Sequence, residues 1–515
     1  MQGSIGAEKA ASTVRDAKLA LRAAWYDAVL SLTEGCEDWA SPFAEQAMLM
    51  KADVLGRRDR VNALEYLTSI EDLFDSVEGR FERDLAAGFL HYRLNDFDTG
   101  DARYDAARKL AGAVTDGEKT LAFHQLRCAF MRRECNLDAP EFALAFSHPD
   151  PHIVTLTHNY RGWYHAALGD LRGQIAECRK ALAVKPRADE PYDVQLRAKN
   201  VYTLALIAFE IADGESVSVA REVADTIAWT PDLDVEHFNT LRWFGWDSFM
   251  RGRPGAAQWS FKDARAVAPS VHWQVMAHLD RSYVARIAKN EAWALDELNQ
   301  ADRLARDTRW ELAAGEERQV LPVLATLFAR VDPVRAQRYA AIYGSIGAAK
   351  GVDPMLGMVK DPRVWAFARY AQGLIDLTLG RPDMAVPAIA AALEKFEAVD
   401  YHFRSTLAAG MLYEATGEQR WREASIAHAN QYPNCPLATF ADDAVAREEV
   451  MPRTLSPFQK QIVRALINGA DVSELSRRFS RSLYTIERQV SEVYSAFDVR
   501  TRGELLDVAQ ARGLA

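Results

Sequence analysis

The chain has 515 residues, of which 49% are hydrophobic, and a formal net charge of −10. A chain of this length and composition can bury more than one core, so we expect two or three domains. Its five scattered cysteines exclude a disulfide framework and indicate reduced thiols. No leader of basic and then apolar residues opens the sequence, and no stretch approaches the roughly 18 apolar residues that a membrane helix needs. We therefore predict a cytoplasmic protein that makes no membrane contact.

Residues 7–435 carry Ala, Leu, Arg and Glu at helical spacing, with few β-branched runs that would indicate strands. Within them a skeleton recurs in which two glycines lie seven residues apart and small or apolar residues follow. Its three best copies begin at Gly162 and Gly169, Gly245 and Gly252, and Gly373 and Gly380. This skeleton resembles the tetratricopeptide repeat, in which the first glycine lets two antiparallel helices approach closely and the second makes the turn.

The resemblance implies that residues 1–435, called the repeat body below, form an all-α solenoid of about nine to twelve hairpins, each of roughly 34–40 residues. The concave face of such a solenoid usually holds a peptide or another ligand. We therefore expect the repeat body to receive a protein, peptide or small-molecule effector.

Tryptophans are concentrated in one part of the repeat body. Seven of the twelve in the chain lie between positions 229 and 310. They could line a pocket for the effector, and Trp243, Trp246 and Trp259 are the candidate ligand-binding residues. The alternative is that these side chains fill the cores between helices, which is the more frequent role of a Trp at helical spacing.

Two further patterns in the repeat body resemble a metal site and a phosphate-binding loop, but the details argue against both. His148, His152, His158 and His165 crowd one stretch, but the stiff His-Pro-Asp-Pro-His turn need not make them converge, so we predict no metal site. Residues 112–120 hint at a phosphate loop, but Glu118 stands where the lysine should follow the second glycine, and no strand precedes it. No nucleophile and base stand in a catalytic pattern. We predict no enzymatic activity and no cofactor.

Residues 436–454 lose the helical periodicity and contain Pro436 and Pro452, so they indicate a linker. From 455 to 515, called the reader domain below, short helical patterns follow one another. Asn468 and Gly469 end the first helix, and Ser482 is a good N-cap for the third. The predicted buried positions of the first helix are Ile462, Val463, Leu466 and Ile467. In the second helix Val472, Leu475 and Phe479 should point inward, and Arg477 and Arg478 outward. The predicted buried positions of the third helix are Ile486, Val490, Val493 and Phe497.

In this order the motifs resemble the LuxR/GerE family of bacterial DNA-binding domains. The residues that carry the resemblance are 455–459, 469, 474–476, 482–486 and 493–502. The resemblance implies a small four-helix, helix-turn-helix domain that places its third helix in a major groove. Together with the repeats, the chain looks like the repeat-plus-reader half of MalT-like regulators without their ATPase.

The predicted DNA contacts fall into two groups. Positions on the outward face of the third helix would read bases, and basic residues around it would contact phosphates. The first group comprises Tyr484, Thr485, Glu487, Arg488 and Ser491, and the second Lys460, Arg477, Arg481 and Arg500. The distribution of charge is consistent with DNA contact by the reader domain. Residues 453–515 hold ten Lys and Arg and seven Asp and Glu, a net charge of +3. The net charge of residues 1–452 is therefore −13.

We therefore predict a transcriptional regulator that binds double-stranded DNA as a homodimer. In the LuxR-like family the last helix makes the two-fold contact, here a helix capped by Thr501 and carrying Leu505 and Leu506. The sequence departs from the family pattern at Phe458, Gln459, Glu487 and Gln489. These departures keep a second hypothesis open, a protein-interaction scaffold or anti-activator that pairs with another regulator and does not bind DNA.

Overall fold

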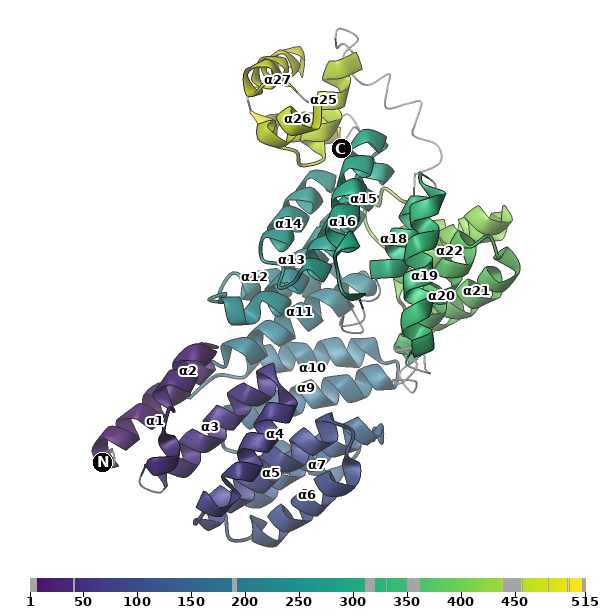
Figure 1. Cartoon of the computed structure of the whole chain (residues 1–515). Helices are drawn as coiled ribbons and strands as arrows, with labels where there is room; N and C mark the ends of the chain where they lie inside the picture. The colour runs from purple at the N-terminus through teal and green to yellow at the C-terminus, as the bar shows by residue number, and fades with distance from the viewer. Residues whose placement is uncertain are drawn as a thin grey trace. The chain divides into compact units, whose positions relative to one another are not determined.

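The computed structural model describes residues 7–39, 42–187, 192–310, 320–329, 331–349, 362–438 and, with single-residue gaps, 455–511. Within these residues the chain forms 26 α-helices, three short 3₁₀ helices and no strand (Figure 1). The prediction of an all-α fold is therefore confirmed. A search of the same residues finds no helix that combines the length and the apolar character needed to cross a membrane. Most of the predicted linker, residues 439–454, lies outside the described residues.

The chain divides into two compact units, and the first comprises Met1–Leu204 and Val223–Leu233. Nothing in the sequence pattern indicated this division. The helices of unit 1 are α1 (Ala7–Arg22), α2 (Tyr26–Leu32), α3 (Phe43–Arg58), α4 (Arg60–Ser69), α5 (Val77–Arg93), α6 (Phe97–Ala111), α7 (Gly117–Arg132), α8 (Pro140–Phe146), α9 (Pro151–Ala167) and α10 (Leu171–Ala183), with 3₁₀ helices η1 (Cys36–Asp38), η2 (Glu71–Leu73) and η3 (Pro231–Leu233). Two of the three unit boundaries fall within α11 (Val194–Glu210) and α12 (Gly214–Ala224), and the third lies between Leu233 and Asp234.

The second unit comprises Ala205–Glu222 and Asp234–Ala515, so it contains both the later repeats and the reader domain. Its repeat helices are α13 (Asp234–Met250), α14 (Pro254–Ala266), α15 (Val271–Ile287), α16 (Glu291–Arg306), α18 (Val320–Ala329), α19 (Pro333–Ala349), α20 (Pro362–Thr378), α21 (Pro382–Glu397), α22 (His402–Thr416) and α23 (Gln419–Ala429). The reader domain contributes α25 (Pro457–Ile467), α26 (Val472–Phe479), α27 (Leu483–Phe497) and α28 (Arg502–Ala511).

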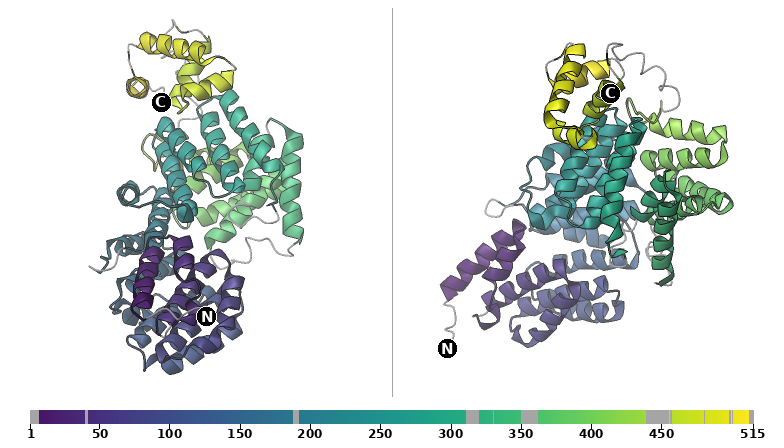
Figure 2. Two further views of the ribbon diagram at one scale, coloured as in Figure 1. Left: turned by 60° about the vertical axis from the view of Figure 1, so that its left-hand side comes forward. Right: turned by 45° about the horizontal axis from the view of Figure 1, so that its top comes forward.

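Consecutive helices pack against each other as hairpins (Figure 1, Figure 2). Ten such pairs occur in the part of the chain that the structure describes: α1–α2, α3–α4, α5–α6, α7–α8, α9–α10, α13–α14, α15–α16, α18–α19, α20–α21 and α22–α23. Their number falls within the predicted nine to twelve. The specific resemblance to the tetratricopeptide repeat stays a prediction, because pairing by itself is common to many helical arrays.

The glycines of the repeating skeleton act as predicted in the turns and in two of the three close approaches. Gly169, Gly252 and Gly380 have φ of +82°, +73° and +70°, the left-handed conformation that glycine adopts without strain. A Cβ on Gly245 would lie 2.6 Å from Phe261 Cε1, and one on Gly373 would lie 2.3 Å from Ile389 Cγ1. At Gly162 the nearest such atom is 3.5 Å away, an ordinary contact, so that glycine is not required for close packing.

Replacing Gly245 by alanine should destabilise the protein, because the new methyl group meets the ring of the fully buried Phe261. The expected cost is about 1–3 kcal/mol, measured as a lower unfolding midpoint. The matched control is Gly344→Ala in the middle of α19, where a Cβ would have nothing within 4 Å. That change should stabilise by up to about 1 kcal/mol through helix propensity. Equal effects of the two substitutions would contradict the packing role of Gly245.

Candidate nucleic-acid interface

The reader domain has its own hydrophobic core, built from the faces that the sequence predicted. The residues fully or almost fully buried in it are Ile462, Val463, Leu466, Ile467, Leu475, Ile486, Val490, Val493, Phe497, Leu505 and Ala509. They recur at helical spacing on α25 to α28, so each helix turns one apolar face inward. The predicted inward face of each of the first three helices is therefore confirmed, with Val472 and Phe479 partly buried against the same core.

Local capping explains where these helices begin and end. Gly469 has φ of +96° just after α25, and the Ser482 hydroxyl accepts a hydrogen bond of 3.2 Å from the backbone N–H of Thr485. The Thr501 hydroxyl likewise accepts from the N–H of Glu504 at 3.2 Å. These three features were predicted from the sequence. The capping of α26 was missed, although Asp471 and Glu474, three residues apart, form a reciprocal capping box with bonds of 2.8 and 3.2 Å.

The face of α27 opposite the core is polar and exposed. Tyr484 is 76% exposed, and Glu487, Arg488 and Ser491 are exposed on the same side of the helix. Thr485 is half-buried at the start of the helix, where its hydroxyl lies 2.8 Å from that of Ser482. The five residues predicted to read bases therefore lie together on one helix, four of them open to solvent.

One carboxylate on this face contacts three neighbouring polar side chains. Glu492 lies 3.5 Å from Arg488 Nε and accepts hydrogen bonds from Gln489 at 2.9 Å and Gln459 at 2.7 Å. An exposed pair of this kind contributes about 0–1 kcal/mol. Arg488 is thus held along the helix by a contact that a nucleic-acid base or phosphate could replace at small cost.

The predicted phosphate contacts are only partly described. Arg477 and Arg481 are exposed at the end of α26 and just before α27. Arg500 and the side chain of Lys460 lie outside the described residues. Arg478, predicted to point outward with Arg477, is instead half-buried against the repeat helices, and its position reveals a contact that the sequence did not predict.

Within unit 2 the reader domain packs on α14, α15 and α16 through a buried network of charges. Arg281 of α15 is only 1% exposed, and its Nη2 lies 3.1 Å from both Glu297 of α16 and Glu474 of α26. Its Nε donates to Gln258 of α14 at 3.2 Å. Lys262 of α14 pairs with Asp471 at 2.7 Å, so two acidic groups of the reader domain are matched to two cations of the repeats.

The same network holds Glu297 as a carboxylate. Burial alone would raise its pKa, but the Arg281 guanidinium and hydrogen bonds from His278 and Trp293 outweigh burial and lower the pKa of Glu297 to about 2. The ion pair therefore persists across neutral and mildly acidic pH. No local pattern singles out Arg281, because the buried positions of α15 also include His278, Asp280 and Ser282.

Arg478 and Arg502 of the reader domain each lie against a tryptophan ring of the repeat helices. Arg478 donates to the Asn290 side chain, and its guanidinium carbon lies 5.0 Å from the centre of the Trp293 ring. Burial lowers the pKa of Arg478 to about 10, and its Nε and Nη1 have no hydrogen-bond partner among the described residues. Arg502 lies 4.8 Å from the ring centre of Trp259 and donates to the Leu466 carbonyl at 2.9 Å. These two cations face the repeats and not the solvent.

Two glycines bring the backbones of this contact close together. A Cβ on Gly255 of α14 would lie 2.5 Å from the Ile467 carbonyl oxygen and 3.3 Å from Leu506 Cδ2. A Cβ on Gly469 would lie 2.3 Å from Gln258 Cβ. The surface of α28 around Leu506, predicted to form a dimer contact, is therefore partly covered by α14 in this structure.

The candidate ligand-binding tryptophans take two different positions. Trp243 and Trp246 are each 5% exposed, and Trp246 packs among the rings of Phe261 and Phe403. Trp259 is 36% exposed and stacks with Lys262 as well as Arg502. None of the three lines either of the two cavities described below. Their role as ligand contacts stays a prediction.

The four histidines that crowd one stretch of the repeat body have separate partners. His148 lies 3.1 Å from the Thr120 hydroxyl, His158 2.6 Å from Glu177, and His165 2.8 Å from Asp170. His152 lies 3.6 Å from Asp193. Within the described residues no group of His, Cys, Asp and Glu side chains could hold a metal ion.

Comparison with known proteins adds no relative: no family model matches the chain, and no curated protein is significantly similar to it.

The substitution Glu474→Gln should loosen the reader domain from the repeats. Glutamine keeps the capping box of α26 but removes the charge that Arg281 faces, at a cost of about 1.5–3 kcal/mol. Hydrogen exchange of the full chain should therefore become at least about tenfold faster across α26, whose protection depends on the contact. The control Glu487→Gln removes an exposed acid of α27 and should leave exchange in α26 unchanged. Unaltered exchange in both variants would show that the buried charge network does not hold the reader domain.

Proposed function

We propose that the protein is a DNA-binding transcriptional regulator in which the repeat body receives a protein, peptide or small-molecule signal and controls a LuxR-like reader domain. The observation that carries this proposal is the exposed polar face of α27 on a four-helix unit whose motifs resemble the LuxR/GerE family throughout. A helix with one face in a small core and the other free for solvent has the form that enters a major groove.

Arg488 is the proposed base-reading residue. Its planar guanidinium can grip guanine O6 and N7 with two hydrogen bonds, whereas its present partner Glu492 is an exposed neighbour on the same helix. Arg477 and Arg481 are proposed phosphate contacts because they are exposed at either side of the turn before α27. Phosphate contacts of this kind position a protein on DNA without specifying sequence.

The contact with α14–α16 suggests how the repeats control the reader domain. A symmetric operator requires a two-fold contact between two reader domains, which the resemblance assigns to the last helix. Leu506 of that helix lies against Gly255 of α14, so docking on the repeats and dimerisation through α28 use overlapping surfaces. A signal that weakens docking would free α28, and with it Arg478 and Arg502, for dimerisation or DNA binding.

The second candidate function is a scaffold or anti-activator that pairs with another regulator. The acids Glu487 and Glu492 on the exposed face of α27 favour it, because carboxylates there would repel phosphates. A gel-shift series from low to high salt distinguishes the two. The regulator proposal expects binding to the DNA that the full chain selects from a random pool, weakening steeply as salt rises. Binding to no DNA at low salt would favour the scaffold.

The first test of base reading is Arg488→Ala paired with Arg488→Lys. Alanine should remove about 1–3 kcal/mol of preference for the selected DNA over random DNA, because the bidentate contact is lost. Lysine keeps the charge but not the two-pronged geometry, so it should fail to restore the preference. Both are measured by competition binding at fixed salt. If alanine weakens binding to all sequences alike and leaves the preference unchanged, Arg488 acts on a phosphate and the assignment as a base reader is wrong.

The proposed phosphate contacts predict a change in salt dependence. Arg477→Ala and Arg481→Ala should each weaken binding to all sequences alike and flatten the plot of log affinity against log salt by about 0.9, the contribution of one released counterion. Arg108→Ala, which removes an exposed arginine of α6, is the control and should leave the slope as it is. A slope that does not change in the first two variants would exclude contact of these residues with phosphates.

A further inference from the structure

Unit 1 contains a cavity of about 520 Å³ between α3, α4, α5, α7, α9 and the start of α11. That volume lies within the 300–1,000 Å³ typical of sites for small molecules. Much of its wall is aromatic, formed by Phe89, Phe123, Tyr160 and Trp163, and leucines of α3, α5 and α9 complete the apolar part. The wall therefore suits the apolar body of a small ligand.

Three arginines of this wall have no acidic partner among the described residues. Arg127 of α7 stacks on Phe89 with its guanidinium carbon 3.3 Å from the ring centre, and its buried Nε has no hydrogen-bond partner among the described residues. Arg93 lies over the same ring at 5.6 Å. Arg60 of α4 donates to the Arg93 carbonyl at 3.5 Å, its one hydrogen bond within the described part of the chain. Two cations thus contact one phenyl ring and a third lies beside them, and the described residues place no carboxylate against any of the three.

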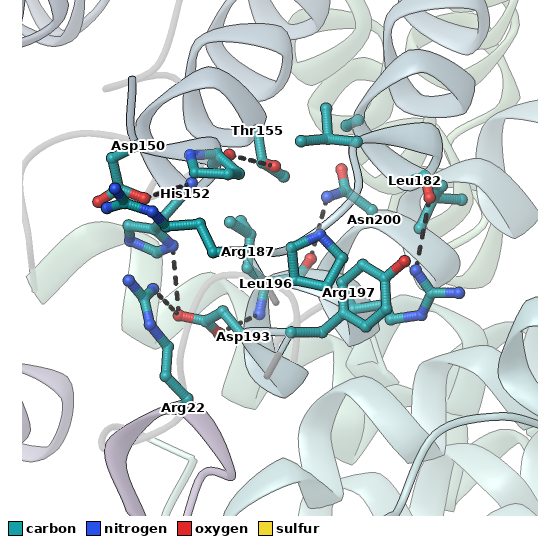
Figure 3. A pocket seen from close by; sticks show the side chains of 15 residues that line it. Arg22, Asp150, His152, Thr155, Leu182, Arg187, Asp193, Leu196, Arg197 and Asn200 are labelled. Carbon is teal, nitrogen blue, oxygen red and sulfur yellow. Dashed lines mark hydrogen bonds and ion pairs between the residues drawn. The ribbon is translucent and has the colours of Figure 1, made fainter. Parts of the chain in front are cut away.

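The acids that line the cavity are engaged elsewhere or weakly ionised. Asp53 pairs with Arg57 at 2.8 Å. Asp193 lies between Arg22, at 3.4 Å, and His152, at 3.6 Å, in a small adjoining pocket (Figure 3). Burial, followed by the neighbouring Glu78, raises the pKa of Glu82 to about 7, so this carboxyl is only partly ionised near neutral pH. The cavity consequently keeps a net positive wall.

Two further observations show that this wall lacks a partner. Burial lowers the pKa of Arg93, and the positive charges of Arg60 and Arg127 lower it further, so the three guanidinium groups repel one another. Asn159 of α9 also lines the cavity, is 7% exposed, and has an amide oxygen with no hydrogen-bond partner among the described residues. Buried polar groups are nearly always satisfied, and a bound anion would accept hydrogen bonds from the arginines, whereas the Asn159 oxygen needs a donor on the ligand or on water.

We propose that this cavity binds a small organic anion, with one carboxylate or phosphate group held by Arg93 and Arg127 and an aromatic or aliphatic body packed against Phe123 and Trp163. Arginine suits either head group, because its fork of donors matches two anionic oxygens. The ligand's role as the signal of the regulator rests on the proposed function. Binding itself does not, and its test contains no DNA.

The test is titration calorimetry of the full chain with 2-naphthoate, 1-naphthyl phosphate, neutral 2-naphthamide and inorganic phosphate. The two naphthyl anions separate a carboxylate ligand from a phosphate ester. At least one of them should bind, and naphthamide, which has the same rings without the charge, should bind at least about tenfold more weakly. Inorganic phosphate, which lacks the apolar body, should also bind at least about tenfold more weakly than the better naphthyl anion. Binding should weaken as salt rises.

Two matched variants locate the site. Arg127→Gln should weaken binding of the better naphthyl anion at least about tenfold, because one charged hydrogen-bonding group is lost. Arg161→Gln is the control: Arg161 also stacks on aromatic rings of unit 1 and has a buried Nε without a partner among the described residues, but it does not line the cavity. It should change affinity by less than about twofold. The proposal is overturned if neither naphthyl anion binds, if naphthamide binds as tightly as naphthoate, or if both variants lose affinity equally while still folded.

Discussion

A helix of the length found here, at most 17 residues among the described elements, is marginal in water when it stands alone. Its stability depends on burying one face against a neighbour, and in this chain the nearest neighbour is the next helix in the sequence. The hairpin is thus the unit of construction, and the small residues of the skeleton set how closely its helices approach. Gly245 against Phe261 and Gly373 against Ile389 show this constraint most directly, because any side chain there would separate the pair. The turn glycines follow from the same need, since the connections at Gly169, Gly252 and Gly380 place a residue in the left-handed conformation, which glycine adopts without strain.

The cavity of unit 1 and the buried ion pairs of unit 2 hold their arginines differently. In unit 2 Arg281 faces Glu297 and Glu474, Arg242 faces Asp280 at 2.5 Å, and Arg404 faces the fully buried Glu210 at 2.9 Å. Pairs of this kind add little net stability, but removing one partner leaves a buried charge and costs several kcal/mol. They therefore select one arrangement of helices over others. Arg60, Arg93 and Arg127 in the cavity of unit 1 lack such partners among the described residues, which is an arrangement suited to an external anion and not to packing.

The contact between the reader domain and α14–α16 combines both kinds of constraint. Gly255 and Gly469 let the backbones meet, and the charges of Arg281 and Lys262 fix which face of α26 is presented. The contact covers part of α28 and the side chains of Arg478 and Arg502, and it leaves the polar face of α27 exposed. It therefore affects the proposed pairing surface and the proposed DNA-binding face differently. The helix proposed to enter DNA is accessible, whereas the surface proposed for pairing is partly covered.

The sequence by itself determined the all-α class, the turn glycines, the buried faces of α25 to α27 and the caps at Ser482 and Thr501. These features depend on residues within one or two helical turns of each other, so local spacing and side-chain chemistry are sufficient to predict them. One local prediction was wrong: at Gly162 the glycine skeleton is present, but the paired helices do not approach closely enough to require a glycine. The outward position predicted for Arg478 was wrong for a different reason, because the partner that covers it, Asn290, is 188 residues away. The pairing of Arg281 with Glu474 spans 193 residues, and the three arginines of the cavity come from three different helices. Only the tertiary structure could decide these, because which faces of distant helices meet depends on the packing of every hairpin between them.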